Sequence, residues 1–155
     1  MSADGSASSG RLPAPQLVVG WDLQPGSSAA LDFAIGIAQR LRAHLHVVHV
    51  ADADDLPIDP DACDWEEQLN QHLVDDETAA RNVLDRLDTK WTYHVAHGRP
   101  GEVIANLADQ TDALMIVVGG PRGGMHSFIE TIAGQSVSRQ LTRRHGRPVL
   151  IVPEP

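Results

Sequence analysis

A glycine-rich stretch, GGPRGGMHSFIETIAGQS, runs from Gly119 to Ser136 and follows the apolar segment ALMIVV. Glycine costs conformational entropy on folding, so its five occurrences there indicate that something requires the bare backbone. Backbone N–H groups freed by glycine can form an anion nest, and the start of a following helix adds partial positive charge. The stretch therefore predicts a phosphate cradle, a close strand-to-helix crossing or a loose surface loop, and spacing alone does not decide between the first two.

The stretch matches neither of two known phosphate-binding loop motifs. The stretch lacks the Gly-Lys-Ser/Thr ending of a Walker loop, and it follows the fourth apolar run, whereas a dinucleotide fingerprint follows the first. From residue 120 to the end there are five arginines against two acids, a local charge of +3, although the whole chain carries −9. Arg122 could therefore offset part of a phosphate's charge. The overall acidity argues against nucleic-acid binding, which needs a basic face.

Other reactive side chains give weaker signals. Asp22 closes an apolar run, where it could contact a ribose or a hydrated metal, or form an Asx turn ahead of Pro25. His44 and His46 would share one face of a strand and His49 the other, with no further ligand at a suitable spacing, so no metal site is expected. The acidic segment DADDLPIDPD lacks the glycine and closing Glu of a calcium loop. No nucleophile, base and orienting group can be assembled, so no catalytic residue is expected.

Alternating elements must position these residues. Apolar runs predict strands over 16–21, 44–50, 91–97, 113–118 and 147–152. Helical periodicity lies between them: one helix capped by Ser27 or Ser28, a long one opened by Asp64, one starting near Pro100, and one over 136–144. The long helix is expected to break near 75–78, where Asp76 interrupts its apolar stripe. Residues 1–15 are small and polar and predict a disordered tail ahead of one domain, 16–155.

Strands that alternate with helices predict an α/β domain: a doubly wound parallel sheet with helices on both faces. In such folds ligands bind at the carboxyl ends of the strands, where the strand order reverses. The glycine stretch and Asp22 both leave strands at that edge. One cysteine and the lack of any apolar run of about 20 residues predict no membrane span and a reducing, cytoplasmic location.

The chain resembles the universal stress protein family over roughly residues 16–153. The likeness rests on the order and spacing of LVVGWD, PGSSAALDFAIGIAQRLRAHLHVVHV, GRPGEVI, ALMIVVGG and GQSVSRQL…RPVLIV. It implies five parallel strands in the order 3-2-1-4-5, a role in stress response or signalling, and no assigned catalytic reaction. It also implies a homodimer through the last strand, Pro148 to Val152. Many members of the family bind ATP, and others do not.

The family pattern also implies a nucleotide site, with Mg²⁺ accompanying ATP. Asp22 matches the aspartate that contacts the nucleotide, and Val50 matches a residue of the adenine pocket. Ten residues separate Gly123 from Gly134, where the pattern has nine, and Gln135 takes the place of its last glycine. The resemblance therefore implies weak ATP binding, with a dimeric interaction protein whose pocket is degenerate as the alternative. The implied nucleotide-binding residues are Asp22, Val50, Gly120, Gly123, Gly134, Ser136, Val137 and Ser138.

Overall fold

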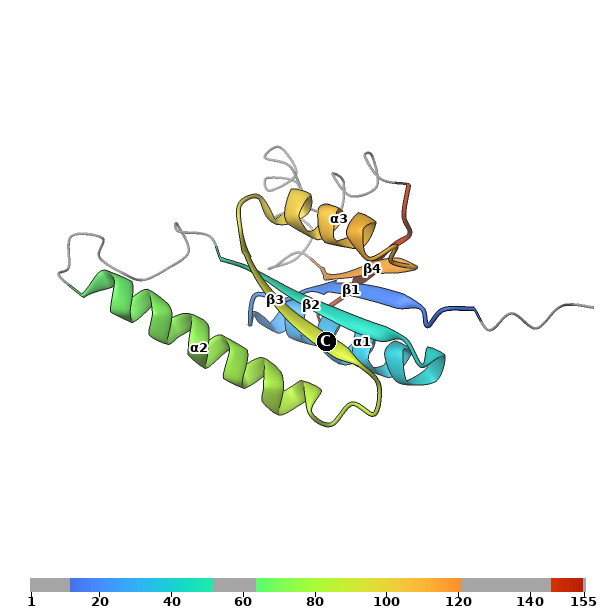
Figure 1. The fold of residues 1–155 in the computed structure, drawn as a ribbon, viewed down its shortest axis with the longest axis horizontal. Helices are drawn as coiled ribbons and strands as arrows, with labels where there is room; N and C mark the ends of the chain where they lie inside the picture. The colour runs from blue at the N-terminus through green and yellow to red at the C-terminus, as the bar shows by residue number, and fades with distance from the viewer. Residues whose placement is uncertain (1–11, 52–63, 121–145, 155) are drawn as a thin grey trace, which may run out of the picture.

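The structure is a computed structural model, and it describes residues 12–51, 64–120 and 146–154. Helices and strands alternate along these ranges (Figure 1). In chain order they are β1 (Gln16–Gly20), α1 (Pro25–Leu41), β2 (His44–Ala51), α2 (Trp65–Leu84), β3 (Trp91–His97), α3 (Pro100–Gln110), β4 (Met115–Gly119) and β5 (Val149–Val152).

The strands form one five-stranded parallel sheet in the order β3-β2-β1-β4-β5, which confirms the predicted fold class and strand order. The chain moves outward from β1 through β2 to β3, then returns to the other side of β1 as β4 and β5. The strand order therefore reverses between β1 and β4, which are neighbours in the sheet. At this switch point the loops that leave neighbouring strands diverge and leave room for a ligand.

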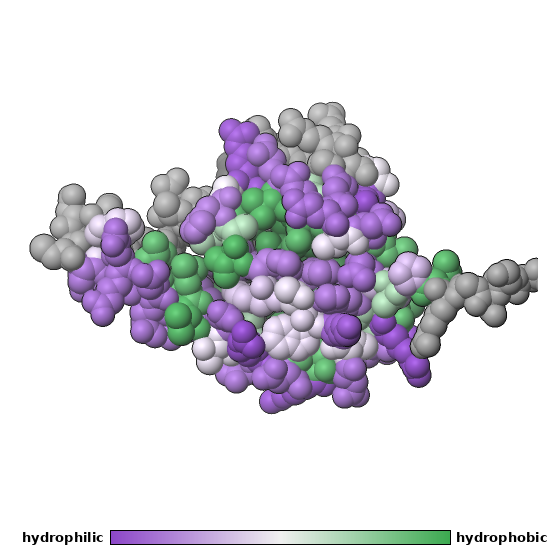
Figure 2. All heavy atoms as spheres, in the orientation of Figure 1, coloured by the Kyte–Doolittle hydropathy of each residue, from purple (hydrophilic) through white to green (hydrophobic). Residues whose placement is uncertain are grey.

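The helices cover both faces of the sheet. Figure 1 shows α3 on one face and α1 and α2 on the other. This division follows from right-handed crossovers, because the connections leading outward and those leading back must pass on opposite faces. Figure 2 shows mostly hydrophilic side chains over α2 and the outside of α3, with hydrophobic ones gathered where α3 meets the sheet.

Two apolar clusters, one on each side of the sheet, make up the core. Leu17, Val19 and Val47 belong to the cluster that includes α1 residues, whereas Val18 and Val48 pack with Ile104 of α3. Successive strand residues point to opposite faces, which explains this division. Strands β1 and β4, which lie inside the sheet, are apolar at nearly every position because both faces of the sheet are covered.

Three local expectations are corrected. The first helix begins at Pro25 with Gln24 as its N-cap, so neither Ser27 nor Ser28 is the cap. Proline suits the first helical position because its missing N–H is not needed there. Asp64 is an N-cap, but its side chain makes no capping hydrogen bond. The long helix α2 continues unbroken through 75–78, and Asp76 faces His49 of β2 at 3.7 Å.

The ends of the domain are described in part. Pro15 precedes β1, and its carbonyl accepts a 2.8 Å hydrogen bond from the backbone N–H of His44. The predicted helix over 136–144 lies outside the described residues. None of the helices within the described ranges is both long enough and apolar enough to cross a membrane.

Candidate functional site

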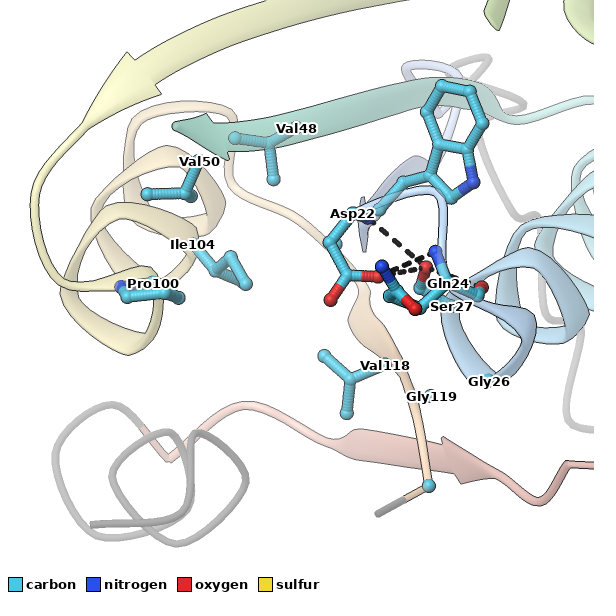
Figure 3. A pocket seen from close by; sticks show the side chains of 13 residues that line it. Asp22, Gln24, Gly26, Ser27, Val48, Val50, Pro100, Ile104, Val118 and Gly119 are labelled. Atoms are coloured by element: carbon cyan, nitrogen blue, oxygen red, sulfur yellow. Dashed lines mark hydrogen bonds between the residues drawn. The ribbon is translucent and has the colours of Figure 1, made fainter. Parts of the chain in front are cut away.

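A cavity of about 230 Å³ lies at the carboxyl ends of β1, β2 and β4 (Figure 3). Its walls come from the β1–α1 turn, the first turn of α1, the end of β2, the start of α3 and the end of β4. The lining residues are Gly20, Trp21, Asp22, Gln24, Gly26, Ser27, Val48, Val50, Pro100, Ile104, Val118, Gly119 and Gly120. The cavity thus occupies the switch point where the sequence predicts a ligand.

The β1–α1 turn fixes Asp22 at the cavity. One carboxylate oxygen, Oδ1, accepts hydrogen bonds from the Gln24 N–H at 3.1 Å and the Ser27 hydroxyl at 2.5 Å (Figure 3). The Asp22 N–H in turn donates to Ser27 Oγ at 3.1 Å. The bond to the residue two positions on makes this an Asx turn. Leu23 completes the reversal with a left-handed φ of 62°.

The opposite wall of the cavity is apolar. Figure 3 shows Val48, Val50 and Ile104 directed toward the space beside Asp22, with Val118 below it. Pro100 closes this wall at the start of α3. A carboxylate on one side and branched aliphatic side chains on the other suit a ligand with a flat apolar part and a neighbouring hydroxyl.

The first glycines of the glycine stretch have a packing role. A Cβ on Gly119 would lie 2.5 Å from the carbonyl carbon and oxygen of Gly26, so only glycine permits the end of β4 to approach α1 this closely. Gly26 is similarly restricted, because a Cβ added there would lie 3.1 Å from the Gly120 carbonyl oxygen. The close-crossing interpretation therefore explains Gly119.

Gly120 lines the cavity, but the expected role of its N–H is corrected. That N–H donates a 2.7 Å hydrogen bond to the carbonyl of Val152 in β5. It extends the β4–β5 ladder, so it does not point toward a phosphate as the nest interpretation requires. Any phosphate contact at Gly120 would have to involve another part of the residue.

The structure brings together three of the site residues expected from the sequence: Asp22, Val50 and Gly120. The others, Gly123, Gly134, Ser136, Val137 and Ser138, lie outside the described residues and stay predictions, as do the roles of Arg122 and Gln135. Sequence reasoning missed Ser27 and the α3 residues Pro100 and Ile104. Pro100 was recognised as a helix start, and a helix that starts after a strand's carboxyl end can reach the switch point.

Behind the cavity, His49 connects β2 to two neighbours. Its Nδ1 lies 3.1 Å from the carbonyl oxygen of Trp21, and its Nε2 lies 3.7 Å from Asp76 Oδ2 of α2. The Trp21 ring meets Tyr93 edge to face, with centroids 6.4 Å apart. Burial raises the pKa of Tyr93, and the carboxylates of Asp76 and Glu77 raise it further. These contacts anchor the residue just before Asp22 to the sheet and to α2.

Three other strand histidines, His44, His46 and His94, form a cluster on the α3 face of the sheet. His44 and His46 stack with centroids 4.2 Å apart, which confirms that they share a face. His46 Nε2 lies 2.8 Å from Gln16 Oε1, and its Nδ1 lies 3.0 Å from His94 Nε2. Burial, with a smaller contribution from the neighbouring His44 and His94, lowers the pKa of His46 to about 4. Within the described ranges, no group of three or more His, Cys, Asp or Glu is arranged to hold a metal ion.

Comparisons with solved structures agree with this fold. The universal stress protein UspA from Lactobacillus plantarum is 23% identical, with a TM-score of 0.66 over 89% of this chain and 97% of that one. A universal stress protein in complex with cAMP is 25% identical, with a TM-score of 0.61 over 92% and 98%. A universal stress protein from Archaeoglobus fulgidus in complex with dAMP is 20% identical, with a TM-score of 0.58 over 90% and 98%.

Sequence comparison assigns the family. A search of curated proteins finds no match. The model of the universal stress protein family matches residues 15–153. That match spans the sheet, the described helices and the switch-point cavity. The chain therefore belongs to the universal stress protein family.

Proposed function

We propose that this protein binds an adenine nucleotide in the switch-point cavity and uses that binding in stress response or signalling. The observation that carries the proposal is the meeting of Asp22, Val50 and Gly120 around one cavity, although they lie at the carboxyl ends of three different strands. The complexes of two similar folds with cAMP and dAMP support an adenine nucleotide as the ligand class.

Each wall of the cavity has a role in this proposal. Adenine packs against Val48 and Val50, whose branched side chains exclude water from its faces. The Asp22 carboxylate accepts a hydrogen bond from a ribose hydroxyl, while the Asx turn holds that carboxylate in place. By the family pattern, Gly123, Gly134, Ser136, Val137 and Ser138 bind the triphosphate of ATP, which Mg²⁺ accompanies.

ATP affinity is weak in this proposal. Gln135 stands where the family pattern has a glycine, and the N–H of Gly120 is already bonded to Val152. A side chain at position 135 would narrow a phosphate cradle, and the bond to Val152 takes one N–H donor from it. We therefore expect a dissociation constant in the micromolar range or weaker, roughly −8 kcal/mol or less favourable.

Calorimetry of the wild type and a Gln135 deletion tests the cradle. The deletion restores a Gly134–Ser136 junction and leaves Gly123 unchanged, so it should tighten ATP binding. A Gln140 deletion is the matched control, since it shortens the same region by one residue outside the motif. If neither wild type nor the Gln135 deletion binds millimolar ATP while both stay folded, the nucleotide proposal is wrong.

A dimeric interaction protein with a degenerate pocket is the second candidate. Two observations favour it: packing against Gly26 explains Gly119, and β5 takes the N–H of Gly120. Mass spectrometry of purified, denatured protein separates the candidates, because a co-purified adenine nucleotide supports the first. Either function is compatible with the cytoplasmic location expected from the sequence.

Both candidates include a homodimer through β5. In the described sheet, β5 pairs only with β4, so its other side forms an edge. The carbonyls of Pro148 and Val152 face β4, and strand alternation turns the backbone polar groups of Val149 and Ile151 outward. An apolar strand at an open edge is an aggregation hazard unless it is paired.

The outward groups allow a specific test of the edge. Ile151→Pro removes an outward N–H without removing a bond to β4, and Ile151→Val is the matched control. Sedimentation should give about twice the 16.7 kDa chain mass for wild type and Ile151→Val, and a monomer for Ile151→Pro. A folded Ile151→Pro variant that remains fully dimeric would contradict pairing through this edge.

A further inference from the structure

The helix α1 carries an exposed aromatic side chain that the core does not explain. Half of the Phe33 surface, 50%, is exposed, although its neighbour Ala34 is fully buried. Ile37, one turn further on, is only partly buried and packs against the same core cluster as Leu150 and Val152 of β5. Phe33 and Ile37 therefore form an apolar flank on α1, and we call this pair the α1 flank.

The contacts of α1 place this flank on the β5 side of the helix. Gly26, two turns before Phe33 and so on the same side, lies against Gly119 at the end of β4. On the other side of α1, the Ser28 hydroxyl lies 3.4 Å from Trp21 Nε1, and Trp21 contacts Tyr93 of β3. The helix also contacts β5 directly. The α1 flank thus borders the sheet edge formed by β5.

We propose that the α1 flank and the outer edge of β5 form one continuous surface that binds a second copy of this chain. The inference rests on the β5 dimer proposed above and adds a second element to it. In an antiparallel pairing of two β5 strands, a two-fold axis perpendicular to the sheet keeps corresponding faces on the same side. The two α1 helices then lie on one face, on either side of the strand pair, with Phe33 of each copy above it.

The length of β5 makes a second contact necessary. Its four residues, at about 3.3 Å each, form an edge roughly 13 Å long. Across a sheet layer of about 10 Å, that edge presents on the order of 100–200 Å² per copy. Stable interfaces bury about 600–1,000 Å² per partner. The edge alone falls well short, and the adjoining α1 flank is apolar, exposed and on the correct side of the helix to supply more area.

Sedimentation equilibrium of the full chain tests the inference. Phe33→Ser removes the aromatic side chain and should raise the dimer dissociation constant about tenfold or more. Val74→Ser is the matched control, because Val74 is also exposed, at 56%, but lies on α2. It should change the dissociation constant by less than about twofold. Phe33→Leu keeps an apolar side chain and should retain most of the dimer.

The outcomes separate this inference from the β5 dimer. A wild-type dimer that Ile151→Pro dissociates and Phe33→Ser leaves intact would overturn the role of the α1 flank but keep the β5 edge. A wild type that stays monomeric at submillimolar concentration would overturn both. The circular dichroism spectrum of Phe33→Ser should match that of the wild type. Any loss of dimer then results from the missing Phe33 contact and not from unfolding. Equal loss of dimer in Phe33→Ser and Val74→Ser would also overturn the inference, because the effect would not be specific to the α1 flank.

Discussion

Acid should destabilise the fold through His46. This side chain is only 7% exposed, and hydrogen bonds occupy both ring nitrogens. The 3.0 Å contact between His46 Nδ1 and His94 Nε2 can hold one proton between them but not two. Stacking of His44 on His46 at 4.2 Å adds a further penalty for charge. Burial and these neighbours therefore favour the neutral form.

The size of the effect follows from the pKa of His46, which falls from 6.5 to about 4 on folding. Because the folded value is lower, the unfolded chain binds more protons between these values, and stability falls as the pH drops from about 6.5 to about 4. A shift of about 2.5 units corresponds to about 3 kcal/mol in full. Between pH 7 and pH 4.5, His46 alone should cost about 2.5 kcal/mol. Burial lowers the pKa of His44 and His94 in the same direction.

Urea unfolding at pH 7 and pH 4.5 measures this loss. His46→Gln replaces the titrating ring with an amide that can still bond to Gln16 and His94, so its loss of stability on acidification should be smaller by about 2 kcal/mol. His72→Gln is the control, since His72 is exposed on α2. Carboxylates titrate in all three proteins, so the contribution of His46 is the difference between the proteins in the free energy of unfolding lost on acidification. If the wild type and His46→Gln lose equal free energy of unfolding, the reasoning about this cluster is wrong.

Three further predictions concern stability. Gly119→Ala should destabilise the fold by about 1–3 kcal/mol, because its Cβ would overlap the Gly26 backbone, and an unchanged melting temperature would contradict the close packing. Arg147→Ala should cost about 1 kcal/mol, since Arg147 bonds Asp109, Asp112 and the Ala113 carbonyl; calorimetry should find a larger loss than for Arg99→Ala, whose ion pair is more exposed. Deleting residues 1–11 should shift the melting temperature by less than about 2 °C, and a larger drop would indicate that this segment packs on the domain.

Much of the fold could be predicted because its signals are local. Apolar runs such as residues 16–20 mark buried strands, and alternation with helices restricts the topology to right-handed crossovers. Asp22 and Val50 could be placed at one edge for the same reason, since they lie at the carboxyl ends of neighbouring parallel strands.

The misses involve partners that are distant in sequence. Asp76 interrupts a helical stripe in the sequence, but in space it faces His49 of β2. From the sequence, the Gly120 N–H is expected to bind a phosphate. In the structure it donates to the carbonyl of Val152 in β5, which is distant in sequence. Ile104 lines the cavity because α3 packs against β1. The spacing of residues in the sequence does not specify how closely a helix packs against a strand.

Calorimetric titration of ATP into a Val50→Trp variant tests the nucleotide site most directly. Val50 lines the cavity, and an indole there should fill much of its roughly 230 Å³ without adding charge. Val95→Trp is the matched control, because Val95 is 41% exposed on β3 and does not line this cavity. Wild type and Val95→Trp should bind ATP alike, and Val50→Trp should bind about tenfold more weakly or not at all. Equal binding by all three folded proteins would contradict a nucleotide site in the cavity.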